Sequence, residues 1–141
     1  MPATPPNWKA GGTIRSSRFI TQSDSYTAVE SNANDRIVGV SMEGSRQAPI
    51  SDSGVTENQA AQAEESFKAY GDGEECLIEL GDAVDVSAEA RLKSDGDGKG
   101  VPIATTGTTV QNFGGYALED GAAGDFVRFR VEIGALRPAI V

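Results

Sequence analysis

The chain has 141 residues, of which 38% are hydrophobic and 17 are glycine, and its formal net charge is −9. This length fits one domain with a modest core, and the glycine content is more typical of a turn-rich β protein than of a helical bundle. The sequence contains no histidine, which excludes Ser-His-Asp and Cys-His nucleophiles and histidine-ligated zinc sites.

The charge is unevenly distributed along the chain. Residues 1–48 carry five Lys/Arg and four Asp/Glu, whereas residues 49–141 carry seven Lys/Arg and seventeen Asp/Glu. Phosphate attraction supplies most of the affinity for nucleic acids, so this acidic body predicts no nucleic-acid partner. Neither an 18-residue apolar run nor a signal-peptide core is present, so no membrane partner is expected. The single Cys76 is expected to be a small buried hydrophobe, consistent with synthesis in a cytoplasm.

Residues 1–12 read MPATPPNWKAGG and are predicted to form a flexible N-terminal arm. Prolines and glycines without apolar periodicity argue against packed structure, and Pro5-Pro6 favours an extended backbone. Trp8 leaves two interpretations open: it folds back on its own domain, or it anchors a partner through its large apolar surface. Residues 13–141 are predicted to form a single β-rich domain.

The remainder of the chain is predicted to be a series of short strands. The clearest alternation runs from Val127 to Ile133, where every second residue is apolar. Residues 21–34 are expected to be mostly loop or sheet edge, with a short strand at Tyr26 to Val29 as an option. Further strands are expected within residues 13–20, 36–42, 74–80 and 113–118, and on both sides of an Asp/Gly turn at 94–100.

One short helix is expected between these strands. Thr56 to Gln59 has the capping-box pattern, and the Ala- and Glu-rich residues up to Glu65 are favourable helix formers. The predicted fold is therefore mainly β: a small β-barrel or β-sandwich-like domain with one short helix and an extended N-terminal arm.

The candidate chemical sites in the sequence are weak. Asp95 to Gly100 (DGDGKG) resembles a calcium loop, but Lys99 stands at the third ligand position and Thr106 at the closing glutamate position. The carboxylate pairs, such as Glu74-Glu75, are adjacent in sequence and do not converge across a cleft as glycosidase chemistry requires. The sequence therefore predicts no catalytic residue, no metal and no cofactor, and the protein is not expected to be an enzyme.

Three segments together resemble a known family. They are RIVGVSMEGSRQAP (36–49), YGDGEECLIELGDAVDVSAEARLKSDGDGKGVPI (70–103) and FGGYALEDGAAGDFVRFRV (113–131). Their order and spacing resemble those of the head-decoration, or capsid cement, proteins of tailed bacteriophages. The resemblance spans roughly residues 13–133.

The resemblance implies a structural virion protein, made in the host cytoplasm. Such a protein forms a homotrimer at local three-fold positions on the outer surface of the icosahedral head, binds the major capsid protein and stabilises contacts between its subunits. The arm is expected to contribute to this binding, so deleting residues 1–12 should leave a folded protein that binds weakly. The implied capsid-binding residues are Pro5, Pro6, Trp8, Ile14, Arg15, Arg18 and Phe19.

Two other functions fit the sequence. A virion-surface β-module that binds a host glycan or receptor would expose aromatic platforms, for which Tyr26, Tyr70, Phe113 and Tyr116 are the candidates. A tail or neck component is the third option.

Overall fold

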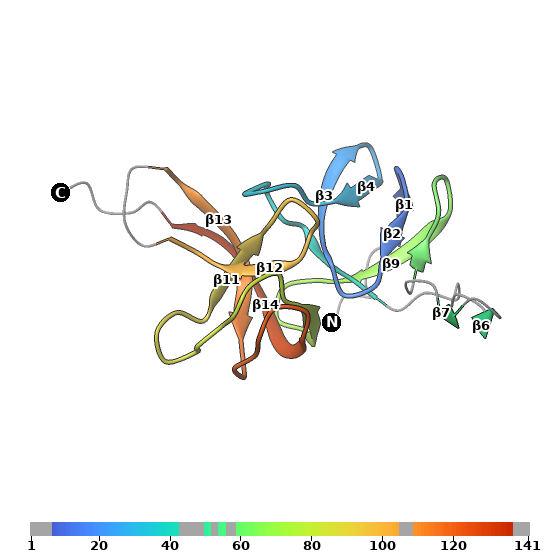
Figure 1. Ribbon diagram of the computed structural model, residues 1–141. Coiled ribbons are helices and arrows are strands. Elements are labelled where there is room, and N and C mark those ends of the chain that lie inside the picture. Colours follow the sequence, from blue (N-terminus) through green and yellow to red (C-terminus); the bar gives the residue numbers. More distant parts are fainter. Residues whose placement is uncertain (1–6, 43–49, 52–53, 56–58, 105–108, 137–141) are drawn as a thin grey trace.

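The computed structural model describes residues 7–42, 50–51, 54–55, 59–104 and 109–136. All regular structure in these ranges is β, which confirms the predicted class. Figure 1 shows two halves side by side, a barrel on the right and a second sheet on the left.

The barrel is closed by the first strand of the described chain. Its strand order is β1-β4-β3-β5-β9, in which β1 pairs in parallel with β4 and antiparallel with β9. The predicted flexible arm is therefore wrong for residues 7–10, because main-chain pairing on both sides fixes this segment; residues 1–6 lie outside the described ranges. The strands are β1 Asn7–Ala10, β3 Phe19–Asp24, β4 Thr27–Glu30, β5 Gly39–Ser41 and β9 Ser66–Tyr70.

The second half is a five-stranded antiparallel sheet with the order β10-β14-β13-β11-β12. The predicted alternation is confirmed from Val127 to Val131 of its longest strand, where Val127, Phe129 and Val131 are buried and the residues between them are exposed. Ile133, the last apolar residue of the predicted alternation, is 39% exposed. The hairpin at 94–100 is confirmed too, because Ser94 pairs with Gly100. The strands are β10 Glu75–Glu79, β11 Arg91–Ser94, β12 Gly100–Pro102, β13 Gln111–Ala117 and β14 Phe126–Leu136.

The predicted helix is wrong for the part of it that the structure describes. Residues 59–61 form β8, which pairs with β2, and a turn follows in which Glu65 N–H donates to the carbonyl of Gln62. Ala61 is buried against the barrel, so tertiary packing overrides the helix propensity of the alanines. Residues 56–58 lie outside the described ranges. The small strands are β2 Ile14–Arg15, β6 Ile50–Ser51, β7 Gly54–Val55 and β8 Gln59–Ala61.

The core consists of two apolar clusters. One lies within the barrel and includes Ile14, Ile20 and Phe67. The larger cluster joins the halves, since Phe19 of the barrel packs edge-to-face on Phe129 of β14, with ring centroids 5.5 Å apart. The larger cluster therefore spans both halves.

Candidate functional site

Arg18, one of the residues predicted to bind a capsid, is buried and bonded within the chain. Its side chain is 3% exposed and forms an ion pair with Glu79, in which Nη2 lies 3.0 Å from Oε1. The Arg18 Nη1 group donates to the carbonyl oxygen of Asp97 at 2.8 Å. Arg18 thus joins the barrel to β10 and to the turn of the β11–β12 hairpin.

Arg15 is also paired inside the chain. Its guanidinium donates to Glu30 through Nε at 3.0 Å and through Nη2 at 2.8 Å, and its backbone N–H donates to the same carboxylate. This two-point geometry is the strong form of an Arg–carboxylate contact. It holds β2 against the end of β4.

The apolar residues of the predicted set are core residues. Ile14 and Phe19 are both fully buried, each in one of the two clusters. Trp8 on β1 is half-buried against the barrel cluster, so the structure favours its packing on its own domain. The Nε1 group of Trp8 is buried and has no hydrogen-bond partner among the described residues. Pro5 and Pro6 lie outside the described ranges.

These positions do not form one exposed surface. Arg15, Arg18, Ile14 and Phe19 make their contacts with other parts of the same chain. Capsid binding by these residues stays a prediction, and the structure gives each of the four a structural role as well.

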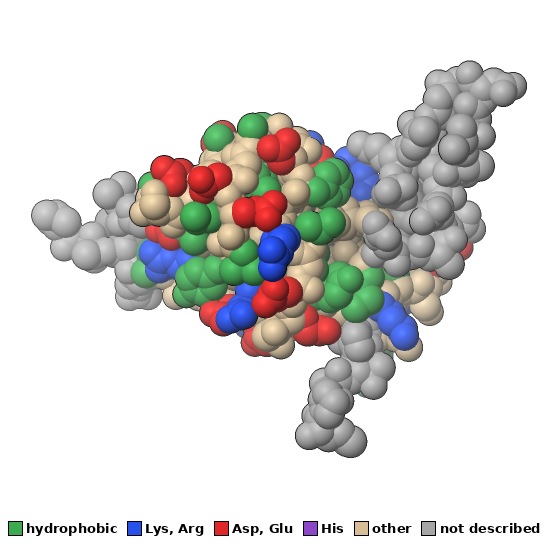
Figure 2. Space-filling view, turned by 90° about the horizontal axis from the view of Figure 1, so that it is seen from below, with side chains coloured by type: hydrophobic (Ala, Val, Ile, Leu, Met, Phe, Trp, Pro, Cys, Tyr) green, Lys and Arg blue, Asp and Glu red, His purple; other side chains and the backbone are tan. Residues whose placement is uncertain are grey.

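Exposed apolar side chains occur elsewhere. Phe126 is 52% exposed and Leu77 is 47% exposed, on the paired strands β14 and β10. Figure 2 shows a face on which apolar, acidic and basic side chains are interspersed. Exposed apolar side chains on neighbouring strands are candidates for contact with a partner.

The aromatic residues considered for glycan binding do not gather into a platform. Tyr26 is 81% exposed, at the β3–β4 turn. Phe113 and Tyr116 pack edge-to-face and are half-buried, with the Arg91 guanidinium 5.8 Å from the centre of the Phe113 ring. Tyr70 packs against the larger core cluster. Of the four, Tyr26 alone is presented to solvent, and the glycan alternative stays a prediction.

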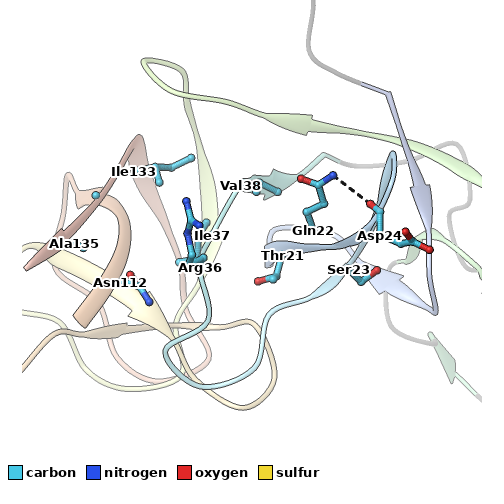
Figure 3. A pocket seen from close by; sticks show the side chains of 11 residues that line it. Thr21, Gln22, Ser23, Asp24, Arg36, Ile37, Val38, Asn112, Ile133 and Ala135 are labelled. Atoms are coloured by element: carbon cyan, nitrogen blue, oxygen red, sulfur yellow. Dashed lines mark hydrogen bonds between the residues drawn. The ribbon is translucent and has the colours of Figure 1, made fainter. Parts of the chain in front are cut away.

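A groove of about 670 Å³ lies between the two halves of the described structure. Figure 3 shows side chains of β3 on one side, those of β13 and β14 on the other, and the segment 36–38 between them. Sequence reasoning missed this groove, because four segments far apart in the chain build it. The lining residues are Thr21, Gln22, Ser23, Asp24, Arg36, Ile37, Val38, Asn112, Ile133, Gly134 and Ala135.

Chemically reactive groups are sparse in the described ranges. Burial, and next the charge of Glu74, raise the pKa of the Cys76 thiol to about 12, so this thiol is protonated and unreactive at neutral pH. Within those ranges no cluster of three or more His, Cys, Asp or Glu side chains is placed to hold a metal ion. No helix there is long and apolar enough to cross a membrane.

Comparison with solved structures gives a likeness of fold. The chain is similar to the N base of the head fiber protein gp8.5 of bacteriophage phi29, with a TM-score of 0.54. The two chains share a fold. The likeness covers 89% of this chain and 91% of that chain at 17% sequence identity, so it concerns architecture. No protein-family model matches the chain, and no curated protein matches it either.

Proposed function

We propose that this protein is a non-catalytic structural component of a bacteriophage virion that binds the outside of the icosahedral head and stabilises contacts between major capsid protein subunits. The observation that carries the proposal is the fold, which matches the base of a phage head fiber over nine-tenths of both chains. The resemblance of residues 13–133 to head-decoration proteins supports the same assignment independently of the fold.

The architecture suits a domain that has to resist mechanical force. One apolar cluster runs through both halves, and Arg18 ties the barrel to β10 and to the β11–β12 turn. Because a close-packed core transmits strain and resists compression, the domain would act as a stiff element between the shell subunits that it contacts. We propose a homotrimer at local three-fold positions, where each protomer contacts equivalent shell subunits.

The folded surface, and not an arm formed by residues 7–12, is the proposed contact region. Residues 7–10 are used inside the barrel, so they are not free to add a strand to a capsid sheet. The exposed apolar side chains of β10 and β14 are available without unfolding.

The test is direct addition of the purified protein to undecorated heads, followed by cryo-electron microscopy and thermal disruption of the shells. We expect added density at local three-fold positions and a higher disruption temperature, whereas an unrelated acidic β protein of similar size should give neither. Light scattering of the free protein separates trimerisation in solution from trimerisation on the shell. Heads that take up no protein at saturating concentration would refute the proposal.

A further inference from the structure

One wall of the groove is an unpaired strand edge. Strand β3 pairs with β5 only at Phe19 and Ile20. Beyond that point β3 pairs with β4 alone. The carbonyl of Ile20 accepts from Val38 N–H on the side away from β4, and backbone groups of alternate strand residues point the same way. The N–H and C=O of Gln22 therefore face the groove, where no described strand pairs with them.

The opposite wall is a second open edge. On the side of β14 away from β13, Val131 N–H donates to the carbonyl of Glu74, and Ile133 N–H donates to Asp72 Oδ1 at 2.7 Å. Ala135 is next in the same alternation and is exposed. Strand β10 pairs with β14 only from Phe126 to Arg130. The backbone of Ala135 thus also faces the groove without a described strand partner.

The groove lining carries one acidic and one cationic side chain. Asp24 accepts a hydrogen bond from Ser25 N–H, whereas Arg36 remains available to pair with an acidic group of a peptide. Arg36 is exposed and, among the described residues, has neither an ion pair nor a hydrogen bond from its guanidinium. Every other described Arg except Arg128 has a side-chain contact with a carboxylate or a ring. No described lining residue is aromatic, which disfavours a saccharide, whereas two open strand edges present donors and acceptors at strand spacing. The volume lies within the range of about 300–1,000 Å³ typical of ligand sites.

We propose that this groove binds an extended polypeptide segment as an added β-strand, with one Asp or Glu side chain of the segment paired to Arg36. Main-chain bonds to the open edges supply affinity, and the charge pair sets the register of the segment. This interaction goes beyond the proposed attachment to heads and does not depend on it, because both edges and the free guanidinium belong to the described chain.

The probe is a surface-displayed library of random extended octapeptides, long enough to span about 26 Å at 3.3 Å per residue. The library is selected for binding to the full-length protein. The enrichment of each peptide is then compared with its enrichment in a parallel selection on the Arg36→Glu variant. We expect the enriched peptides to carry one acidic residue among β-branched residues. The best peptide, made synthetically, should shift the Gln22 and Ala135 amide signals of the ¹⁵N-labelled protein.

Two variants test the groove residues, and a third serves as the matched control. Arg36→Glu should weaken binding of that peptide by about tenfold or more, and Ala135→Pro should abolish it by removing an edge N–H. Arg128→Glu makes the same charge change on an exposed arginine outside the groove, so it should change affinity by less than about twofold. Circular dichroism and thermal melts establish that each variant is folded.

Each result of these experiments either supports or overturns the proposal. Failure to enrich any peptide over the Arg36→Glu background would overturn the proposal, as would equal losses in the Arg36 and Arg128 variants. An acidic glycan that shifts the groove amides while no peptide does so would assign the groove to a saccharide and would also overturn it. Head binding that persists in all three variants leaves the proposed function standing, and the peptide data alone then decide the inference.

Discussion

Replacing Arg18 with methionine tests whether this residue holds the fold or contacts a partner. The substitution keeps an apolar stem but removes the hydrogen bonds to Glu79 and to the Asp97 carbonyl. Removing one member of a buried pair costs about 3–5 kcal/mol. The Glu79 side chain is 17% exposed and keeps Lys99 at 3.5 Å, so we expect the low end, about 3 kcal/mol. At roughly 4 °C per kcal/mol for a chain of this size, the Tm should fall by about 12 °C.

The measurement is urea denaturation together with calorimetry, compared with Arg128→Met, an exposed site that should change stability by less than about 0.5 kcal/mol. The double variant with Glu79→Met should recover part of the loss, because no uncompensated charge remains. A stability loss below about 1 kcal/mol in Arg18→Met would refute this reasoning. If head binding fell while stability did not, Arg18 would be the contact residue that the family resemblance implies.

Three further predictions follow from other contacts. Gly115→Ala should lower the free energy of unfolding, measured in urea, by more than about 2 kcal/mol. The φ angle of Gly115 is +152°, and an added Cβ would meet the Arg130 carbonyl oxygen. Gly12→Ala should be near neutral, because there is open space around Gly12. Alkylation of Cys76 at pH 8 should be roughly 1,000-fold slower than for a thiol of pKa 9. Deleting residues 1–12 should unfold the barrel in circular dichroism spectra, because β1 is lost, whereas deleting residues 1–6 keeps β1 and should leave the protein folded.

Each of these has a contrary result. Equal stability of the two alanine variants would mean that the backbone at Gly115 relaxes easily. Fast alkylation of Cys76 in the folded protein would show that its thiol is exposed and ionised. A slow alkylation rate that rises between pH 9 and 12 would support the raised pKa. A folded protein without residues 1–12 would show that β1 does not close the barrel.

Features with local signals were the predictable part of the fold. The alternation of β14, the hairpin at 94–100 and the strand from Glu75 to Glu79 each depend on residues that are close in sequence. Strand β1 was not predictable in this way, because its partners β4 and β9 begin at Thr27 and Ser66. The prolines and glycines that flank it in residues 1–12 indicate local backbone preferences and carry no information on pairing. The helix expected near Ala61 failed for a related reason, since that alanine is needed in the core.

The candidate sites show the same limit. The family resemblance implied Arg18 as a binding residue, but its burial was not predictable because its partner Glu79 lies 61 residues away. The groove joins β3, the segment at Arg36, β13 and β14, and no local pattern marks such a meeting. Arg36 itself stood at the start of a predicted strand, and an unpaired cation there was visible only in three dimensions.

The shared core between the two halves has a consequence for biosynthesis. Phe19, Ile37 and Val40 belong to the half that leaves the ribosome first, and Phe129, on which Phe19 packs, belongs to the last strand. At translation rates of roughly 5–20 residues per second, the nascent barrel carries these apolar side chains uncovered for several seconds. Prematurely terminated chains that lack β14 should therefore depend on chaperones or aggregate, and cellular quality control would act on these incomplete chains.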